Sequence, residues 1–292
     1  MKDTKLLTII VTYNGAKWIK KCIQSVLNST IKSDVYVIDN GSTDNTLSII
    51  QSHFPEVILI KSNKNLGFGA ANNYGIIYAL ENNYDYIYLL NQDAYVSKNA
   101  FEELIILQKE NPEYGIISPI QINDSGELDK NFFGICPKSM FSDYINGNVK
   151  VLYDVHEVMA AHWLISRECI ETVGGFSPSF PHYGEDTNYV NRLHFHNLKI
   201  AISPNIKCVH DREFRPISKE KIYYLQYIWA ITLASQLNKS IPLTRIIFMA
   251  FIKNSLSMRS IIPIKYMFKF IRKYNAIRKN RLLSKQPMAF IY

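Results

Sequence analysis

The sequence predicts an α/β fold with a mostly parallel sheet in its first half, and two observations support this prediction. Short apolar, β-branched runs alternate with segments of helical character, and a polar turn follows each run. This alternation is typical of βαβ units, in which helices join consecutive parallel strands. The predicted strands are 6–12, 35–39, 57–61 and 86–91, and the predicted helices are 16–28, 43–53 and 70–81. In such sheets the turns that follow the strands line a common crevice for ligands.

The rest of the chain has a different pattern. Residues 115–150 are irregular, a helix is expected at 186–197, and a short strand at 199–202 precedes Cys208-Val209-His210. Three helical segments follow, at 218–238, 242–258 and 263–283, and Pro242 and Pro263 suit their first turns. We therefore predict a domain of residues 1–216, with halves 1–115 and 116–216, and a helical tail of residues 217–292.

Charge is distributed unevenly between these two parts. Residues 217–292 contain 14 Lys or Arg and a single acid, Glu220, which gives a net charge of +13. The 216 residues before them contain 19 basic and 24 acidic residues, a net charge of −5. Because the positive excess lies in an apolar, aromatic tail, it favours anionic lipid head groups as a partner over nucleic acid.

Cysteine usage and hydropathy indicate the compartment. Cys22, Cys136, Cys169 and Cys208 are far apart, which favours neither a zinc site nor a disulfide framework and suits reduced cytosol. The apolar start is short and β-branched, so we interpret it as a buried strand and not as a signal peptide. No uncharged apolar run approaches the roughly 20 residues of a membrane-spanning helix.

The turns after the first two strands suit a nucleoside. Asp39 provides a carboxylate for the imide N–H of uracil or thymine, and Tyr13 has a ring that can lie against the base. Asp39 and Ser42 are equally typical of a turn that caps the next helix.

A glycine-spaced segment, 63–75, opens the next predicted helix. Its backbone can approach a phosphate or ribose closely, with Gly67 at its centre. The segment matches neither the G-x-G-x-x-G fingerprint nor the P-loop, which disfavours a dinucleotide dehydrogenase and an ATPase.

Acidic residues follow two predicted elements. Asp93 comes directly after strand 86–91 and suits Mg²⁺ or Mn²⁺ bound to a diphosphate, although it can equally start the next helix. Glu185 and Asp186 precede a helix, where a carboxylate can deprotonate a sugar hydroxyl or simply favour the helix dipole. His210 is a further candidate metal ligand, although a single histidine is more often structural.

These motifs together resemble the family 2 glycosyltransferases over about residues 6–218. The segments that carry the resemblance are Thr8-Ile9-Ile10-Val11-Thr12-Tyr13-Asn14, Asp39-Asn40-Gly41-Ser42-Thr43-Asp44, Asn65-Leu66-Gly67-Phe68-Gly69, Leu89-Leu90-Asn91-Gln92-Asp93, Gly174-Gly175-Phe176 and Gly184-Glu185-Asp186. The resemblance implies a GT-A fold with a Rossmann-like, nucleotide-binding sheet, a nucleotide diphosphate sugar donor, a divalent metal and an inverting single displacement. It makes 1–115 the nucleotide-sugar half and 116–216 the acceptor half.

The resemblance also implies roles for individual residues. Asp186 matches the catalytic base, and Asp93 and His210 match metal ligands. Glu185 and Trp163 are assigned to the acceptor side. The expected donor-binding residues are Thr12, Tyr13, Asn14, Asp39, Gly67, Asn72, Asn91 and Gln92. Three positions depart from the family pattern: Asn91 replaces the first acid of Asp-x-Asp, Asn72 replaces a donor-binding arginine, and Ser177 replaces an acid.

The finer expectation is a single-sugar transfer, because the Gln-x-x-Arg-Trp motif of processive synthases is absent. The loop around Gly67 looks most like rhamnosyltransferase-type members that build surface polysaccharides, which makes dTDP-rhamnose the leading donor and UDP-hexoses the next. The acceptor is expected to be a saccharide or lipid-linked saccharide at the inner face of the cytoplasmic membrane. A nucleotidyltransferase and an inactive membrane-bound scaffold remain alternatives, and dimerisation through the tail stays open.

Overall fold

The structure is a computed structural model that describes residues 4–213 and 217–291. Within these residues nine strands form one sheet in the order β3-β2-β1-β4-β8-β6-β9-β5, and β7 pairs with β9. The strands are β1 (Leu6–Thr12), β2 (Asp34–Asp39), β3 (Ile58–Lys61), β4 (Tyr86–Asn91), β5 (Ala94–Tyr95), β6 (Tyr114–Ile122), β7 (Tyr153–Asp154), β8 (His162–Ser166) and β9 (Lys199–His210). Most paired residues belong to parallel ladders, so the predicted α/β fold is confirmed.

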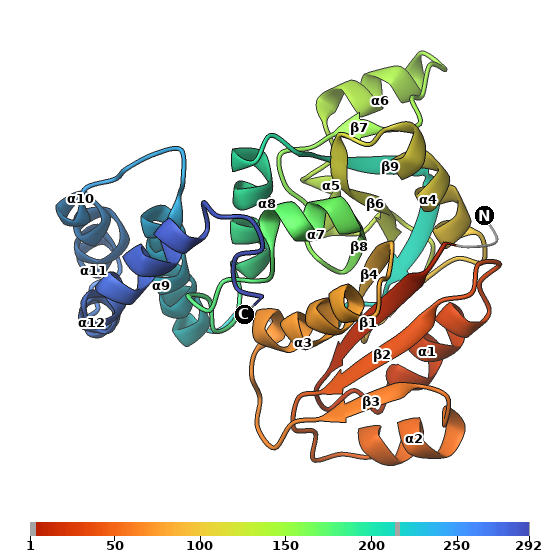
Figure 1. Cartoon of the computed structure of the whole chain (residues 1–292). Helices are drawn as coiled ribbons and strands as arrows, with labels where there is room; N and C mark the ends of the chain where they lie inside the picture. The colour runs from red at the N-terminus through yellow and green to blue at the C-terminus, as the bar shows by residue number, and fades with distance from the viewer. Residues whose placement is uncertain (1–3, 214–216, 292) are drawn as a thin grey trace.

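Helices cover both faces of this sheet, as Figure 1 shows. Alternate side chains of β1 explain the two layers: Leu6 and Ile10 are buried under α1, α2 and α4, whereas Leu7 and Ile9 are buried under α3, α7 and α8. Strands buried on both faces appear in a sequence as continuous apolar runs. The helices are α1 (Ile19–Leu27), α2 (Thr46–His53), α3 (Phe68–Glu81), α4 (Ala100–Glu110), α7 (Arg167–Val173) and α8 (Glu185–Phe195).

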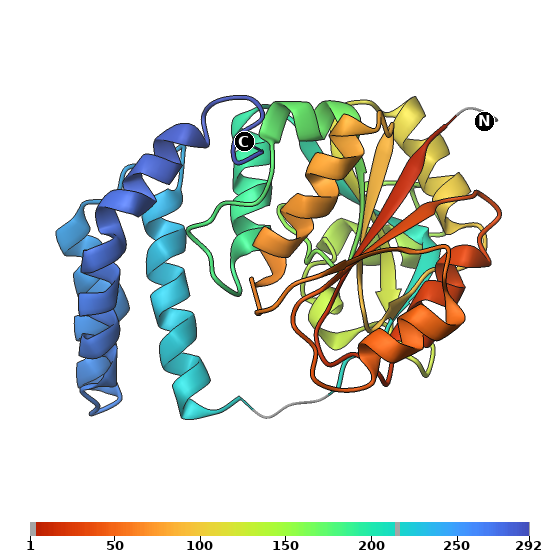
Figure 2. The same ribbon diagram turned by 60° about the horizontal axis from the view of Figure 1, so that its bottom comes forward.

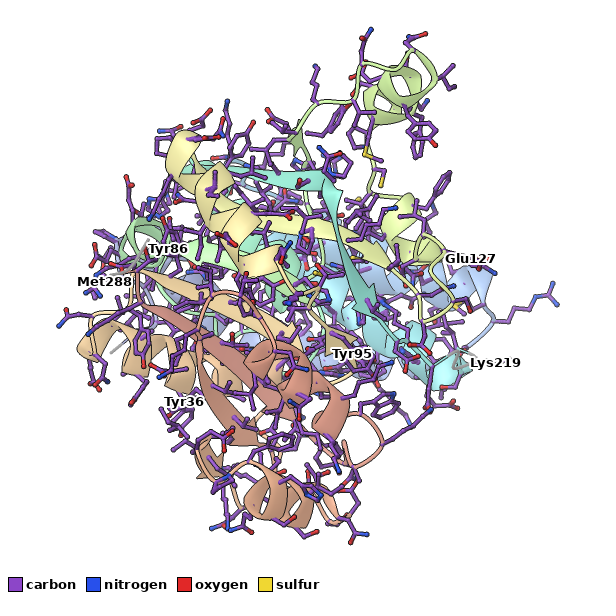
Figure 3. The ribbon with its side chains drawn as sticks, turned by 90° about the vertical axis from the view of Figure 1, so that its right-hand side faces the viewer. Tyr36, Tyr86, Tyr95, Glu127, Lys219 and Met288 are labelled. Carbon is purple, nitrogen blue, oxygen red and sulfur yellow. The ribbon has the colours of Figure 1, made fainter. Side chains whose placement is uncertain are left out.

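The region expected to be irregular contains an additional strand and two short helices. β6 lies in the centre of the sheet between β8 and β9. β9 is longer than the predicted strand 199–202 and continues to His210, with a register shift against β6 between Pro119 and Ile120. Helices α5 (Lys130–Phe133) and α6 (Lys138–Ile145) follow β6, and α6 stands away from the sheet in Figures 1 and 3.

The predicted helical tail forms a separate layer beside the sheet (Figure 2). It consists of α9 (Lys219–Ser235), α10 (Leu243–Ile247), the π-helix η1 (Phe248–Ile252), α11 (Lys253–Ser257) and α12 (Ile262–Leu283). These helices pack around an apolar cluster of their own that includes Tyr227, Phe251 and Phe270. After α12 the chain returns to the sheet layer, where the Gly175 N–H donates to the Ala289 carbonyl at 2.8 Å. None of the helices in the described part of the chain is long and apolar enough to span a membrane.

Candidate functional site

Two adjoining clefts lie at the carboxyl ends of β1, β2 and β4, where the sequence predicts that the polar turns meet. The first cleft has a volume of about 540 Å³ and is lined on one side by Tyr13, Asn14 and Asn40. The second cleft has a volume of about 440 Å³ and is lined by Glu185, Asp186 and His210. Both clefts share Trp18, Phe68, Asn91, Gln92, Asp93 and His182.

Asp39 lies at the end of β2 and is 1 % exposed. Its Oδ2 accepts hydrogen bonds from the backbone N–H groups of Gly41 at 3.2 Å and Ser42 at 3.0 Å, which is the turn that the sequence allows. Its Oδ1 is buried and has no hydrogen-bond partner among the described residues. A buried carboxylate oxygen without a donor is costly, so this atom is suited to receive an N–H from a ligand.

Gln92 and Thr12 support Tyr13. The Oε1 of Gln92 accepts from the Thr12 hydroxyl at 2.7 Å and from the Tyr13 backbone N–H at 2.9 Å, and its Nε2 donates to the Tyr13 carbonyl at 3.3 Å. The ring of Tyr13 is 45 % exposed at the first cleft. Thr12 is fully buried and so holds the turn in place without facing a ligand.

Asn14 joins the turns after β1 and β2. It has a φ of 49°, a left-handed conformation that Asn tolerates better than most residues. Its Oδ1 accepts from the Thr43 backbone N–H at 2.9 Å, and its own N–H donates to the Ser42 hydroxyl at 2.8 Å. The first cleft therefore has a wall fixed by hydrogen bonds from backbone N–H groups to side-chain oxygens.

The glycine-spaced turn before α3 brings Phe68 to both clefts, whereas the predicted residues Gly67 and Asn72 line neither of them. Gly67 has a φ of +85° and lies against the Pro181 carbonyl, so a side chain there would clash. Asn72 is 1 % exposed, and its Nδ2 donates to the Phe68 carbonyl at 2.9 Å within its own helix. The prediction that Asn72 contacts the donor is corrected: its short amide reaches only the previous helical turn, and the Phe68 side chain lines both clefts instead.

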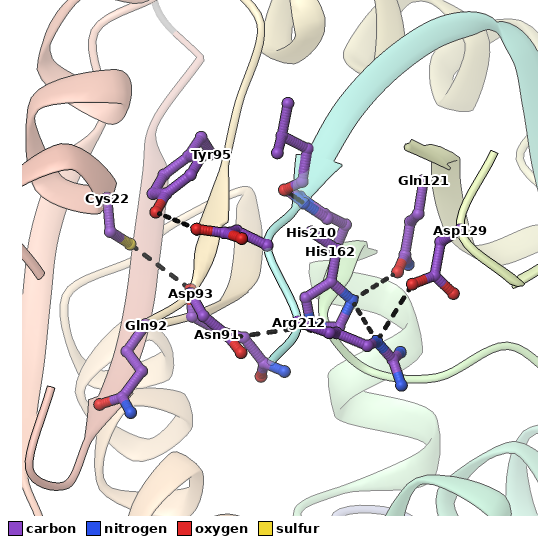
Figure 4. Close-up of polar contacts among 12 residues, drawn as sticks. Cys22, Asn91, Gln92, Asp93, Tyr95, Gln121, Asp129, His162, His210 and Arg212 are labelled. Atoms are coloured by element: carbon purple, nitrogen blue, oxygen red, sulfur yellow. Dashed lines mark hydrogen bonds and ion pairs between the residues drawn. The ribbon is translucent and has the colours of Figure 1, made fainter. Parts of the chain in front are cut away.

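Asp93 and His210 meet on the floor of the second cleft, as Figure 4 shows. They come together because β5 pairs antiparallel with the end of β9, which sets Ala94 opposite His210. The Nε2 of His210 lies 3.6 Å from the Oδ1 of Asp93. Burial alone would raise the pKa of Asp93, but the hydrogen bond and charge of His210 outweigh burial and hold this pKa below its ordinary value.

This pair fits a divalent cation that also binds a diphosphate. No cluster of three His, Cys, Asp or Glu side chains that could hold a metal ion occurs among the described residues. Two protein ligands suffice where phosphate oxygens and water complete the coordination, as is usual for Mg²⁺. A carboxylate with an imidazole also suits Mn²⁺.

The sequence analysis missed the residues behind His210. Its Nδ1 lies 3.0 Å from the Gln121 Oε1 and 3.1 Å from the Arg212 Nε (Figure 4). The ring nitrogen must donate to Gln121 but accept from Arg212, so the two contacts select opposite tautomers. Only the tautomer that donates to Gln121 leaves Nε2 free for a metal. Arg212 also lies 3.5 Å from Asp129, which keeps its charge partnered.

The acidic pair Glu185 and Asp186 begins α8 and lines the opposite side of the second cleft. Burial and then the charge of Asp186 raise the pKa of Glu185 to about 7. Burial also raises the pKa of Asp186, although the Thr187 N–H donates to its Oδ1 at 2.8 Å. A carboxylate with a raised pKa is a stronger base, and this suits both acids to accept a proton from a hydroxyl group.

The structure also corrects the assignment of Trp163. Its ring is fully buried in the core, with ring centroids 6.4 Å from Phe176 and 5.8 Å from Tyr189. The residue lies on β8, a central strand covered on both faces, and therefore has no surface for an acceptor.

Comparison with known proteins identifies the family to which the sequence is similar. The model of the family described as Glycosyl transferase family 2 matches residues 8–174, more than half of the chain. Chondroitin synthase of Escherichia coli is 42 % identical over 81 residues, which are 26 % of this chain and 12 % of that protein. A low-salt glycan biosynthesis hexosyltransferase of Haloferax volcanii is 26 % identical over 235 residues, covering 76 % of this chain and 73 % of that protein.

Solved structures share the fold at low sequence identity. S. aureus TarS 1-349 in complex with UDP has a TM-score of 0.59 at 15 % identity and covers 97 % of this chain and 90 % of that chain. A mannosyltransferase from Pyrobaculum calidifontis, in complex with GDP-Man and Mn²⁺, has a TM-score of 0.55 at 16 % identity and covers 94 % of this chain and 73 % of that chain.

Proposed function

The chain belongs to glycosyl transferase family 2, and from this premise we propose that it transfers a single sugar from a nucleotide diphosphate sugar to a saccharide acceptor with inversion. One observation carries the proposal. The Asp93–His210 pair and the Glu185–Asp186 pair line the same cleft, and this cleft adjoins the one bordered by the turn after Asp39. The reacting sugar thus has a place between a diphosphate site and a base.

We assign the first cleft to the nucleoside. The free Oδ1 of Asp39 accepts the imide N–H of a pyrimidine, and the exposed ring of Tyr13 packs on the base. dTDP-rhamnose is the leading donor and UDP-hexoses come next, since an imide contact does not separate thymine from uracil. Structural neighbours bind both kinds of nucleotide sugar, UDP-GlcNAc in S. aureus TarS and GDP-Man in the Pyrobaculum calidifontis mannosyltransferase, so the choice of a pyrimidine rests on Asp39.

Asp93 and His210 are the proposed ligands of Mg²⁺ or Mn²⁺. A cation bound there supplies positive charge against the negative charge that develops on the leaving nucleoside diphosphate. Gln121 orients the His210 ring so that Nε2 faces Asp93. Asn91, which replaces an acid, leaves Asp93 as the anionic ligand at this turn.

Asp186 is the proposed general base. As the acceptor oxygen forms its bond to the anomeric carbon, the bond from that carbon to the diphosphate oxygen breaks, and the acceptor proton moves to the Asp186 carboxylate. Attack on the face opposite the leaving group inverts the anomeric configuration. Glu185, with its pKa of about 7, is partly protonated near neutral pH and is placed to donate a hydrogen bond to the acceptor.

The biological setting that we propose is cell-surface polysaccharide synthesis at the inner face of the cytoplasmic membrane. The basic tail supports attraction to anionic lipid, and a lipid-linked saccharide is an acceptor available at that surface. Membership of a glycosyltransferase family sets the nucleotidyltransferase alternative aside. An inactive scaffold remains the competing hypothesis because of Asn91.

The test is a screen of dTDP-rhamnose, UDP-hexoses and GDP-mannose with Mn²⁺ or Mg²⁺, with release of nucleoside diphosphate as the readout and NMR of the product anomer. We expect one pyrimidine donor to react with inversion. Asp186→Asn should still bind this donor and lose about 10²–10⁴ in rate. A retained anomeric configuration contradicts the mechanism, and donor binding without turnover for every donor and acceptor favours the scaffold.

A further inference from the structure

The helical layer ends in an apolar, basic tip that the catalytic proposal does not use. The α11–α12 tip (residues 256–261) contains Leu256 and Ile261, and each of these side chains is 73 % exposed. Arg259, between them, is also exposed. Exposed apolar side chains that form a continuous patch, unlike single ones, mark an interaction surface.

An apolar stripe leads to this tip along one continuous helical rod formed by α10, η1 and α11. Phe248, Ile252 and Leu256 follow one another at intervals of four residues and are 55 %, 37 % and 73 % exposed. Residues four apart lie on the same side of a helix. The exposed Lys253 adjoins the stripe, so the rod has an apolar side bordered by positive charge.

The positive charge of the helical layer favours an anionic binding partner. From Lys221 to the end of the chain the sequence contains 13 Lys or Arg and no Asp or Glu. A basic surface alone would suit any polyanion, including nucleic acid. Exposed apolar side chains beside the cations favour a lipid interface, where apolar groups enter the acyl boundary and cations meet anionic head groups.

The position of the tip connects it with the two clefts. The Gln226 amide of α9 donates to the Met258 sulfur of the tip at 3.4 Å. In the same half of α9, the Tyr224 hydroxyl donates to the carbonyl of His182, a residue that lines both clefts, at 3.1 Å. Figure 2 shows the start of α9 (cyan) and the turn between α11 and α12 (blue) at the same end of the helical layer.

We infer that the α11–α12 tip and the stripe behind it form an interfacial anchor for an anionic lipid surface. Docking by this end brings the clefts near the membrane, so the acceptor class that the geometry favours is a saccharide attached to a membrane lipid. The acceptor part of this inference rests on the proposed function, whereas the lipid contact does not.

The decisive experiment uses labelled surface cysteines, because all four natural cysteines are buried. Ile261→Cys is labelled with an environment-sensitive NBD fluorophore and mixed with vesicles of phosphatidylcholine alone or with about one third phosphatidylglycerol. We expect a blue-shifted, brighter emission only with the anionic vesicles. Tyr144→Cys on α6, where Tyr144 is 76 % exposed, is the matched control and should not change.

Flotation of the full chain with the same vesicles gives the second readout. The double substitution Leu256→Ser with Ile261→Ser should lower vesicle partitioning roughly tenfold or more, because two apolar side chains no longer insert. Tyr144→Ser with Ile145→Ser, which also removes two exposed apolar side chains, should leave partitioning unchanged. Thermal melting with and without UDP is measured on each variant as a check of folding and of the nucleotide site.

Three results would overturn the inference: equal partitioning of wild type and the Leu256/Ile261 variant, an NBD signal from the α6 control, or binding of single-stranded DNA as tight as vesicle binding. Wild type that is stabilised by UDP yet ignores vesicles refutes the anchor and leaves the proposed function standing. Wild type that binds vesicles but is not stabilised by UDP supports the anchor and contradicts the proposed function.

Discussion

Glu185 is the titratable group whose environment gives the most direct prediction, because its carboxyl is buried at the start of α8 beside a second acid. Burial and the charge of Asp186 raise its pKa from 4.5 to about 7. Unfolding returns this carboxyl to water, where its pKa is ordinary. The native protein therefore binds the Glu185 proton more tightly than the unfolded chain does.

The sign of the pH dependence follows from this difference. The stability contributed by the bound proton is complete below about pH 4.5 and is lost as the pH rises through about 7. The change in pKa from 4.5 to about 7 corresponds to about 3 kcal/mol, because one pH unit is worth about 1.4 kcal/mol. Glu185→Gln keeps the shape of the side chain and removes its ionisation. We expect this variant to exceed wild type in free energy of unfolding by up to about 3 kcal/mol near pH 8, and by little near pH 4.5.

Urea unfolding followed by circular dichroism between about pH 4.5 and 8 measures the effect. Glu168→Gln is the matched control, because Glu168 is an exposed acid that also lies in the first turn of a helix, α7, and the substitution removes the same charge there. It should change stability by no more than about 0.5 kcal/mol at any pH. Parallel pH profiles for wild type and Glu185→Gln would refute the claim that Glu185 is held partly protonated.

Substitutions at four other residues test the nucleotide and metal sites. Asp93→Ala should abolish the dependence of UDP binding on Mn²⁺ in calorimetry, and His210→Ala should weaken it less; unchanged metal dependence in Asp93→Ala would contradict the assignment. Asp39→Ala should weaken UDP or dTDP binding by about 1.5–3 kcal/mol, because it removes a hydrogen bond to a charged acceptor, and an unaltered Kd would move the nucleoside elsewhere. Gln121→Leu should lower the Mn²⁺ affinity of the UDP complex about 10–100-fold, which Mn²⁺ electron paramagnetic resonance measures. Gln121→Glu keeps an acceptor for the His210 ring and should retain most of the Mn²⁺ affinity.

The first four strands were predictable because each is a continuous apolar run that is buried on both faces and ends at a polar turn. Strand β6 could not be predicted, because Pro119 interrupts its apolar pattern and the residues that follow the strand are irregular and obscure where it ends. The same difficulty shortened β9, where Pro204 marks the register shift against β6. A proline within a strand removes a ladder hydrogen bond, so a central strand that contains one has no clear sequence signal.

The missed residues of the site follow from these missed strands. Gln121 lies on β6, and its contact with His210 exists only because β6 and the end of β9 are neighbours. Asp93, His210 and the acids of α8 could be named as candidates from the sequence because each follows or begins a recognisable element, and the structure brings them to one cleft. Asn72 and Trp163 were assigned without knowledge of their contacts. The Asn72 amide bonds within its own helix and the Trp163 ring packs among core rings, whereas the equally buried Asp39 keeps an unpaired Oδ1.

Arg192 links the acidic pair to the rest of the site. Its guanidinium is fully buried, and it donates to the carbonyls of Val173 at 2.8 Å and of Gly175, so it ties α8 to the turn before Phe176. Asn73 of α3 holds that turn from the other side, since its Oδ1 accepts from the Phe176 N–H at 2.7 Å and its Nδ2 donates to the Phe176 carbonyl at 3.0 Å.

Burial lowers the pKa of Arg192 to about 10, so the group remains charged at neutral pH and needs these carbonyl dipoles in place of water. α3 begins at Phe68, which lines both clefts, and α8 begins at the two acids. The turn at residues 174–176 therefore joins α8, through Arg192 in its last turn, to α3, through Asn73 in its second turn. The two helices that carry Phe68 and the proposed base are thus joined by buried hydrogen bonds, a rigidity that suits the proposed displacement reaction.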